Sequence, residues 1–332
     1  PVIKALQWLK ENQNSDGSWG SGKVADTGLA ILTYLAHGET PASQAFGPVV
    51  EKGIKYLIGV QKENGELSAD AYAHGIATYA LSESFAMTKI IQIKDSMEKA
   101  VQVIIDGHGD KAMDARTDVA ISGWQLQAMK SARLAGAANF HRERATTKAV
   151  YLAKKFNQAT KFLDTVKFSW PPEGEIPLEL YFHLTQKKFL EGGKPWVEWN
   201  KSFAPTLAGA QKPDGRWDIG GQEKFLSPVS QTSLSALMLE VYYRYLPSLQ
   251  KTEDWPVIPK ETIDPALIYN PVVQTRDNAF STFAIDVDTA SFTLARRSLL
   301  SGAMPAPNAI RVEEFVNAFE YAYPTPERRA FA

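Results

Sequence analysis

Apolar residues recur with helical spacing through most of residues 1–248. Five stretches of this region are apolar around most of a helix circumference, namely residues 24–38, 70–85, 117–136, 176–193 and 227–247. Several of them open on Asp, Ser or Thr and close on Gly or Pro, the residue types that start and end helices. Because a helix that is apolar all round is buried, we expect five inner helices.

Segments of a second kind precede these stretches, and their Lys and Glu residues leave one face polar, as in residues 45–60 and 148–163. A helix with a single apolar stripe lies on the outside of a layer. Outer and inner helices in alternation predict an all-α protein. We expect an α/α toroid, a double-layered ring of about five helical hairpins, provided that its curvature closes.

A short motif returns at the turns between outer and inner segments. It consists of Gln, three residues, Gly, one residue and a large apolar side chain, and its copies are Gln13 to Gly17 to Trp19, Gln61 to Gly65 to Leu67, and Gln211 to Gly215 to Trp217. The first two glutamines lie 48 residues apart and the last two 150 apart, which leaves room for two more copies. Weaker copies place His108 and Asn157 at the Gln position. Five units of about fifty residues indicate a repeat architecture.

This motif resembles the QW repeat of squalene and hopene cyclases and, more broadly, of the bacterial prenyltransferase and squalene oxidase repeat proteins. The resemblance covers residues 1–248 and implies structural roles for Gln13, Trp19, Gln61, Gln211 and Trp217. In that family the Gln ties a helix end to its neighbour and the Trp stacks on it. The physical chemistry agrees, because an amide can bond orphan backbone groups at a helix end and an indole can shield that bond from water.

The residues that carry chemistry on this fold are missing. Cyclases that protonate an alkene or epoxide resemble one another in a DxDD motif that holds one acid neutral, and no DxDD occurs in this chain. With no Cys, the chain cannot build the zinc site of protein prenyltransferases or the thioester of complement-like proteins. The resemblance therefore implies a fold without these activities, and we expect no cofactor.

Two stretches resemble metal sites but are incomplete. Residues 12–17 look like the first half of a calcium loop, yet Lys23 stands where that loop needs a bidentate Glu. Four aspartates recur every fourth residue around His108: Asp106, Asp110, Asp114 and Asp118. Glycines beside His108 favour a loop, and a solvated acidic turn in which Asp118 caps the next helix is the alternative to a cation site. We expect no metal.

The candidate catalytic residues are Tyr72, His74, Asp118 and His183. Tyr72 and His74 would lie near the start of an inner helix at the mouth of the ring, and Tyr181 and His183 repeat the Tyr-x-His pattern. Tyr and His can act as acid and base, as in polysaccharide lyases, some of which share an α/α toroid. On a crowded inner helix, they can instead satisfy each other within the core.

A central cavity would be lined by inner-helix side chains, and the candidates are Asp26, Tyr72, His74, Trp124, Gln125, Tyr181 and Gln231. Aromatic residues at helical spacing either line such a cavity or fill it: Trp124 and the tyrosines at 34, 79, 242, 243 and 245. The 36 basic residues nearly balance the 37 acidic ones, so no net positive charge would attract nucleic acid. No apolar run reaches the ~20 residues of a membrane span. We expect a protein partner or a small apolar or sugar ligand.

The composition and the spacing of apolar residues change after residue 248. Residues 249–280 are rich in Pro without helical period, which predicts an extended linker. Residues 281–332 predict a strand, a helix to Leu300 and a helix from Val312, a small α+β appendage. Asp286 and Asp288 follow the strand as in haloacid-dehalogenase phosphatases, but only 44 residues follow Asp288, too few for that fold.

The segment instead resembles the lead-in to the A domain in a family of bacterial von Willebrand factor proteins. The resemblance rests on residues 281–292, Arg296 and Arg297, residues 304–307 and residues 311–314. It implies a longer protein that continues into an A domain. We therefore expect a non-catalytic interaction or ligand-binding scaffold in the cell envelope, although the cytoplasm stays open. The alternative is an enzyme on a cyclase-like or lyase-like toroid with a central cavity.

Overall fold

The protein is described by a computed structural model that covers residues 1–108, 115–141, 143–160, 166–172, 178–219, 226–241, 246, 290–300, 305 and 311–319. The chain divides into two compact units, residues 1–271 and 272–332. Within the described ranges all regular structure is helical, and the one β-type pairing is an isolated bridge between Gln13 and Trp19. The prediction of an all-α fold is confirmed.

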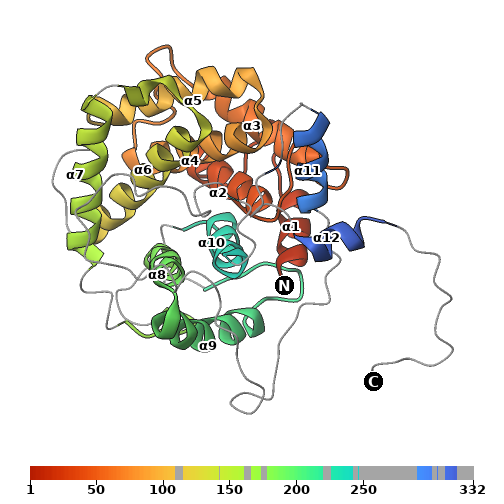
Figure 1. The fold of residues 1–332 in the computed structure, drawn as a ribbon. Coiled ribbons are helices and arrows are strands. Elements are labelled where there is room, and N and C mark those ends of the chain that lie inside the picture. The colour runs from red at the N-terminus through yellow and green to blue at the C-terminus, as the bar shows by residue number, and fades with distance from the viewer. Residues whose placement is uncertain are drawn as a thin grey trace, which may run out of the picture. The chain divides into compact units, whose positions relative to one another are not determined.

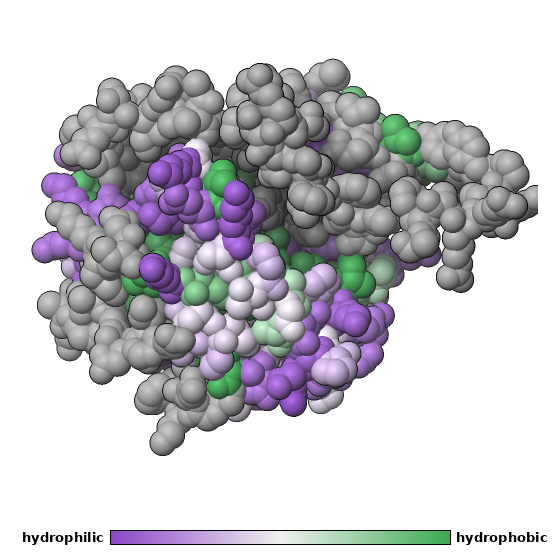
Figure 2. Space-filling model, turned by 90° about the horizontal axis from the view of Figure 1, so that it is seen from below, coloured by the Kyte–Doolittle hydropathy of each residue, from purple (hydrophilic) through white to green (hydrophobic). Residues whose placement is uncertain are grey.

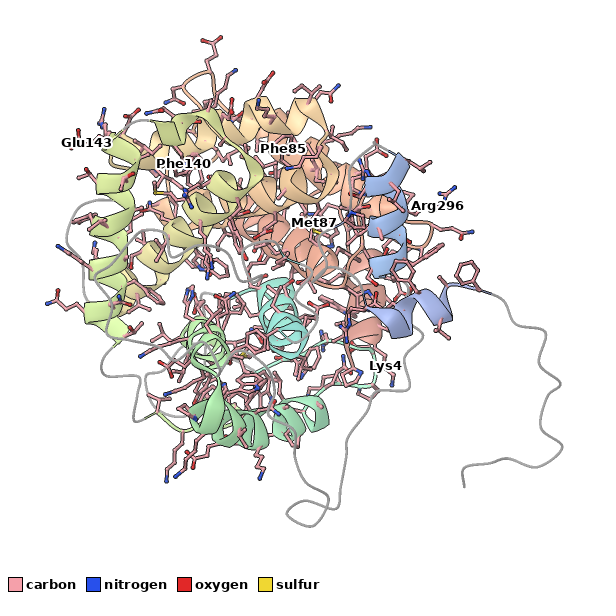
Figure 3. The ribbon with its side chains drawn as sticks, in the orientation of Figure 1. Lys4, Phe85, Met87, Phe140, Glu143 and Arg296 are labelled. Carbon is pink, nitrogen blue, oxygen red and sulfur yellow. The ribbon has the colours of Figure 1, made fainter. Side chains whose placement is uncertain are left out.

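The first unit alternates outer and inner helices. The outer helices are α1 (Val2–Glu11), α3 (Gly47–Val60), α5 (Ile91–Ile105), α7 (Glu143–Thr160) and α9 (Gly193–Gly209). The inner helices are α2 (Lys23–Ala36), α4 (Ala71–Thr88), α6 (Ala115–Ala135), α8 (Leu178–Glu191) and α10 (Pro228–Glu240). A short 3-10 helix, η1 (Ala138–His141), precedes α7, and Phe140 and Glu143 mark this junction in Figure 3.

Burial separates the two classes of helix. Every residue of α2 from Asp26 to Ala36 is buried, whereas α1 buries only the stripe Val2, Ala5, Leu6, Trp8 and Leu9. Polar inner-helix residues tolerate burial because their hydroxyls bond the carbonyl four residues earlier, as Thr78 does with His74 and Ser82 with Thr78, each at 2.7 Å. The inner helices therefore form the core layer.

The inner helices contact one another in a closed cycle, α2 to α4 to α6 to α8 to α10 and back to α2. Figure 1 shows α2, α4 and α6 as one run of neighbours and α8 beside α10. Each outer helix packs on the inner helix of its own or an adjacent hairpin, for example α3 on α2 and α4. Five hairpins thus suffice to close the ring.

The second unit contains α11 (Ala290–Leu300) and α12 (Val312–Asn317). The Glu314 carboxylate accepts a 2.6 Å hydrogen bond from the backbone N–H of Ser291, in the first turn of α11, and Arg311 Nε lies 3.3 Å from Glu314. Phe292 packs edge-on against Phe315, with ring centroids 5.4 Å apart. The predicted helices are present, and the linker and the strand expected before them lie outside the described residues.

Candidate functional site

The recurring Gln–Gly–apolar turns, here called corner motifs, share one hydrogen-bond geometry. Gln13 Nε2 donates to the carbonyls of Gly17 and Val49, both at 3.0 Å. Gln61 Nε2 donates to Gly65 at 3.0 Å and Ser96 at 2.9 Å. In both motifs one amide joins the turn of its own hairpin to the next outer helix, so the Gln links successive units.

The third corner motif links the last hairpin to the first. Gln211 Nε2 donates to the carbonyl of Gly215 at 2.7 Å and to that of Pro1 at 2.8 Å. Gly215 has a φ of +98°, and a Cβ added there would collide with the backbone carbonyl of Lys4, the α1 residue labelled in Figure 3. Only Gly combines this φ with so close an approach.

The indoles of the corner motifs are fully buried and bonded. Trp19 Nε1 donates to the carbonyl of Leu9, and Trp217 Nε1 donates to that of Leu207, both at 2.7 Å. Each carbonyl lies near the C-terminal end of the preceding outer helix and also accepts from the backbone N–H just after that helix, of Asn12 or Ala210. Both tryptophans have 0% exposure, so these bonds are shielded from water.

The backbone N–H of the apolar residue in each corner motif is bonded by an inner-helix side chain. Thr27 Oγ1 accepts from Trp19 at 3.0 Å, and Thr232 Oγ1 accepts from Trp217 at 3.2 Å. His74 takes this place in the second motif: its Nδ1 accepts from Leu67 N–H at 3.2 Å. Its Nε2 must then carry the proton, and it lies 3.1 Å from the carbonyl of Ala100.

Both ring nitrogens of His74 are thus engaged with backbone groups. Burial lowers its pKa from 6.5 to about 4, with a smaller contribution from neighbouring His108, whose ring centroid lies 4.9 Å away. The ring is neutral at pH 7. His74 therefore has neither the vacant nitrogen nor the pKa of a general base, and its geometry is that of a structural bridge.

Asp26 and Gln231, two of the predicted cavity residues, bond structural groups. Asp26 Oδ1 accepts from the hydroxyls of Ser227 and Ser230 at 2.5 Å each, and its Oδ2 accepts from the backbone N–H of Gly22 at 3.0 Å. These bonds join the start of α2 to the start of α10. Gln231 accepts from Ile219 N–H and donates to the Leu226 carbonyl, both at 2.9 Å.

Tyr72 has a different environment. Its hydroxyl oxygen is buried close to the Glu179 carboxyl of α8. Burial raises the Tyr72 pKa well above 10, and Glu179 of α8, Asp26 and Asp70 raise it further. Burial also raises the pKa of Glu179. A phenol and a carboxyl that both favour the protonated form thus lie close together at the starts of two inner helices.

Trp124 and Tyr79, two of the predicted aromatic residues, lie in the core. Trp124 stacks on Phe182 at 4.9 Å between ring centroids and 15° between planes, and Tyr79 lies 6.2 Å from Trp124. These side chains are at most 2% exposed. His183 packs against Trp124 at 5.0 Å and is fully surrounded, and burial lowers its pKa to about 3.

Tyr181 and Gln125 bond different backbone carbonyls. The Tyr181 hydroxyl donates to the Lys167 carbonyl at 3.3 Å and lies 3.1 Å from Ser169 Oγ. Gln125 Nε2 donates to the His108 carbonyl at 2.7 Å. Asp118 belongs to α6, but its side chain, together with Asp110, Asp114 and the tyrosines at 242, 243 and 245, lies outside the described residues.

The structure therefore joins Tyr72 to a residue that sequence reasoning missed, Glu179, and does not join it to His74 or His183. Glu179 follows Leu178 at the start of α8, and its position in the first turn of an inner helix was the available signal. Across the described part of the chain no group of three or more His, Cys, Asp or Glu side chains is arranged to hold a metal ion. No described helix is long and apolar enough to cross a membrane.

Comparison with known proteins gives separate matches to short parts of the chain. Residues 265–332 match the family model described as von Willebrand factor. The chain is 52% identical over 50 residues to the uncharacterized protein YfbK of Escherichia coli (strain K12), which covers 15% of this chain and 9% of that protein. It is 34% identical over 82 residues to the squalene–hopene cyclase of Bradyrhizobium diazoefficiens, covering 20% and 12%.

No solved structure matches the chain. The chain spans 9% and 12% of the lengths of the two curated relatives. The activities of these whole proteins are therefore not assigned to this chain. The predicted resemblance of the C-terminal segment to von Willebrand factor proteins is confirmed at the family level for residues 265–332. The resemblance of the helical ring to cyclase repeats has the support of one distant similarity.

Proposed function

We propose that residues 1–248 form a non-catalytic toroid of the QW-repeat type that acts as a scaffold for protein partners. In this proposal residues 249–280 are a linker, and residues 281–332 lead into a von Willebrand factor A domain of a larger bacterial envelope protein. The match at residues 265–332 supports the second half of the proposal. The contacts of the candidate residues support the first half.

The observation that carries the scaffold role is the use of polar side chains inside the ring. His74, Asp26 and Gln231 form hydrogen bonds with backbone groups and hydroxyls, and these bonds join helices or turns. Trp124 and Phe182 stack on each other and are at most 2% exposed. A layer built in this way holds its outer surface rigid, as a binding scaffold requires.

The outer surface offers positions for testing partner binding. Figure 2 shows a pale patch of weakly polar and apolar residues between strongly hydrophilic residues on one face. On α9, Ser202, Pro205, Thr206 and Gly209 are exposed and uncharged. A photo-crosslinking residue at Ser202 or Thr206, and one at Lys55 on α3, samples two sides of the scaffold.

We expect site-dependent protein adducts in the bacterial host from at least one of these positions. The same adduct should form in the Tyr72→Phe and Glu179→Gln variants, because a scaffold does not need these groups. An adduct that also forms when the chain is crosslinked in urea, where it is unfolded, reports only non-specific association. The proposal fails if no folded-state adduct forms from any position scanned over the outer helices.

A second candidate function rests on the pairing of Tyr72 with Glu179. A protonated carboxyl beside a phenol can supply a proton, which general acid catalysis requires, and one relative of the chain is a squalene–hopene cyclase. The full chain can be incubated with squalene, and separately with an acidic polysaccharide, and the products separated. The scaffold proposal predicts no turnover. Turnover that disappears in Tyr72→Phe, while the melting temperature is unchanged, would establish the enzyme instead.

A further inference from the structure

The boundary between α6 and α8 differs from the other boundaries of the inner ring. Neighbouring inner helices make their sparsest contact there within the described residues. Among the described side chains, Gln127 Nε2 donates to Gln186 Oε1 across this boundary at 3.0 Å. The boundary between α2 and α10, by contrast, is crossed by both hydroxyl bonds of Asp26.

Polar atoms without partners line the same boundary. Trp124, Gln127 and Ser131 follow one another at three and four residues on α6, which places them on one face of the helix. Trp124 Nε1, Gln127 Oε1 and Ser131 Oγ are buried and have no hydrogen-bond partner within the described part of the chain. On the facing helix α8, His183 Nε2 is also buried and has no hydrogen-bond partner among the described residues.

This face of α6 meets α8 directly, because Trp124 stacks on Phe182 and Gln127 bonds Gln186 one turn further along both helices. Buried polar atoms without partners destabilise the closed arrangement, since water would bond them. Hydration of these atoms lowers the free energy of any opening that exposes them. Local opening occurs where contacts are sparse and opening costs least.

We infer that the ring opens at the boundary between α6 and α8 while the other inner helices stay packed. The opening exposes the row Trp124, Gln127 and Ser131 to solvent. This inference goes beyond the scaffold role and does not depend on it. Ser233, Ser235 and Glu240 of α10 also have buried atoms without partners among the described residues, but α10 is held to α2 by Asp26 and Thr33.

The absence of Cys from the chain allows a direct test by thiol labelling. Ser131→Cys places one thiol at the boundary, at a position with 0% exposure. Ser84→Cys is the matched control: Ser84 on α4 is equally buried, and its hydroxyl donates to the Ala80 carbonyl at 2.6 Å. Labelling of each folded variant is followed across urea concentrations below the unfolding transition, together with its global unfolding.

We expect Ser131→Cys to be labelled at least about tenfold faster than its own global unfolding allows, with little dependence on urea. Ser84→Cys should be labelled only through global unfolding, with the steep urea dependence of that process. Because each rate is compared with the stability of the same variant, a destabilising substitution does not confuse the result. If the Ser131→Cys thiol follows global unfolding as Ser84→Cys does, the inference is wrong.

Discussion

At the residue scale, His74 shows how a catalytic residue type can serve as a structural one. Thr27 and Thr232 accept the equivalent N–H in the first and third corner motifs, so His74→Thr keeps an acceptor for Leu67 but loses the bond to Ala100 and part of the ring volume. His74→Ala loses both bonds and the ring volume. We expect the free energy of unfolding to fall by about 3 kcal/mol in His74→Ala and by roughly half of that in His74→Thr. Urea unfolding at pH 7.5 measures both, and equal losses in the two variants would contradict the bridging role.

His74 also predicts how stability depends on pH. Its folded pKa of about 4 lies below the unfolded value of 6.5, so between these values the unfolded chain binds a proton that the folded chain does not. Stability contributed by the neutral ring is complete above pH 6.5 and is lost as pH falls toward 4, by roughly 3 kcal/mol. His183, with a folded pKa of about 3, adds to the same loss. Urea unfolding at pH 7 and pH 5 should therefore show a smaller difference in His74→Thr than in the unmodified chain.

Glu240 has the opposite effect on the pH dependence of stability. Its side chain is 1% exposed, neither oxygen has a hydrogen-bond partner among the described residues, and burial raises its pKa well above 4.5. The folded chain holds a proton that the unfolded chain releases above pH 4.5, so stability falls as pH rises from there through the folded pKa. Glu240→Gln removes this loss and should be more stable than the unmodified chain at pH 8. Glu63→Gln, at an exposed position, is the control and should change little.

At the element scale, the starts of the inner helices show two ways of satisfying orphan N–H groups. Asp70 caps α4 by accepting from the N–H groups of Tyr72 and Ala73, whereas Asp26 joins α2 to α10 through two serine hydroxyls. Asn caps a helix about as well as Asp does, so Asp70→Asn should cost less than about 0.5 kcal/mol. Asp26→Asn presents one carbonyl oxygen where the carboxylate serves three donors, and should cost about 2 kcal/mol. Similar losses in the two variants, measured by urea unfolding, would show that the hydroxyl bonds of Asp26 add little to stability.

At the scale of the whole molecule, the periodic pattern predicted the alternation of outer and inner helices, because the spacing of apolar residues in each segment determines which of its faces are buried. The corner motifs were predicted because Gln13, Gln61 and Gln211 keep one spacing to Gly. The pairing of Tyr72 with Glu179 could not be predicted, since it depends on how α4 and α8 meet across the ring. That Trp124 Nε1 and Ser131 Oγ have no hydrogen-bond partner among the described residues could not be predicted either, because a sequence records polar residues and not their hydrogen bonds.

Closure of the ring is the property that a sequence leaves most open, and Gln211 tests it. Gln13 bonds a carbonyl of α3, and Gln211 bonds the carbonyl of Pro1 just before α1. In a closed ring Gln211→Ala loosens α1, some two hundred residues away in sequence, and hydrogen exchange of its backbone amides should accelerate about tenfold. Gln13→Ala is the matched variant and should accelerate exchange at the start of α3 instead. If Gln211→Ala left α1 protection unchanged while Gln13→Ala loosened α3, the Gln211 amide would add nothing to the junction between the last hairpin and the first. The packing of α10 on α2 would then close the ring without it.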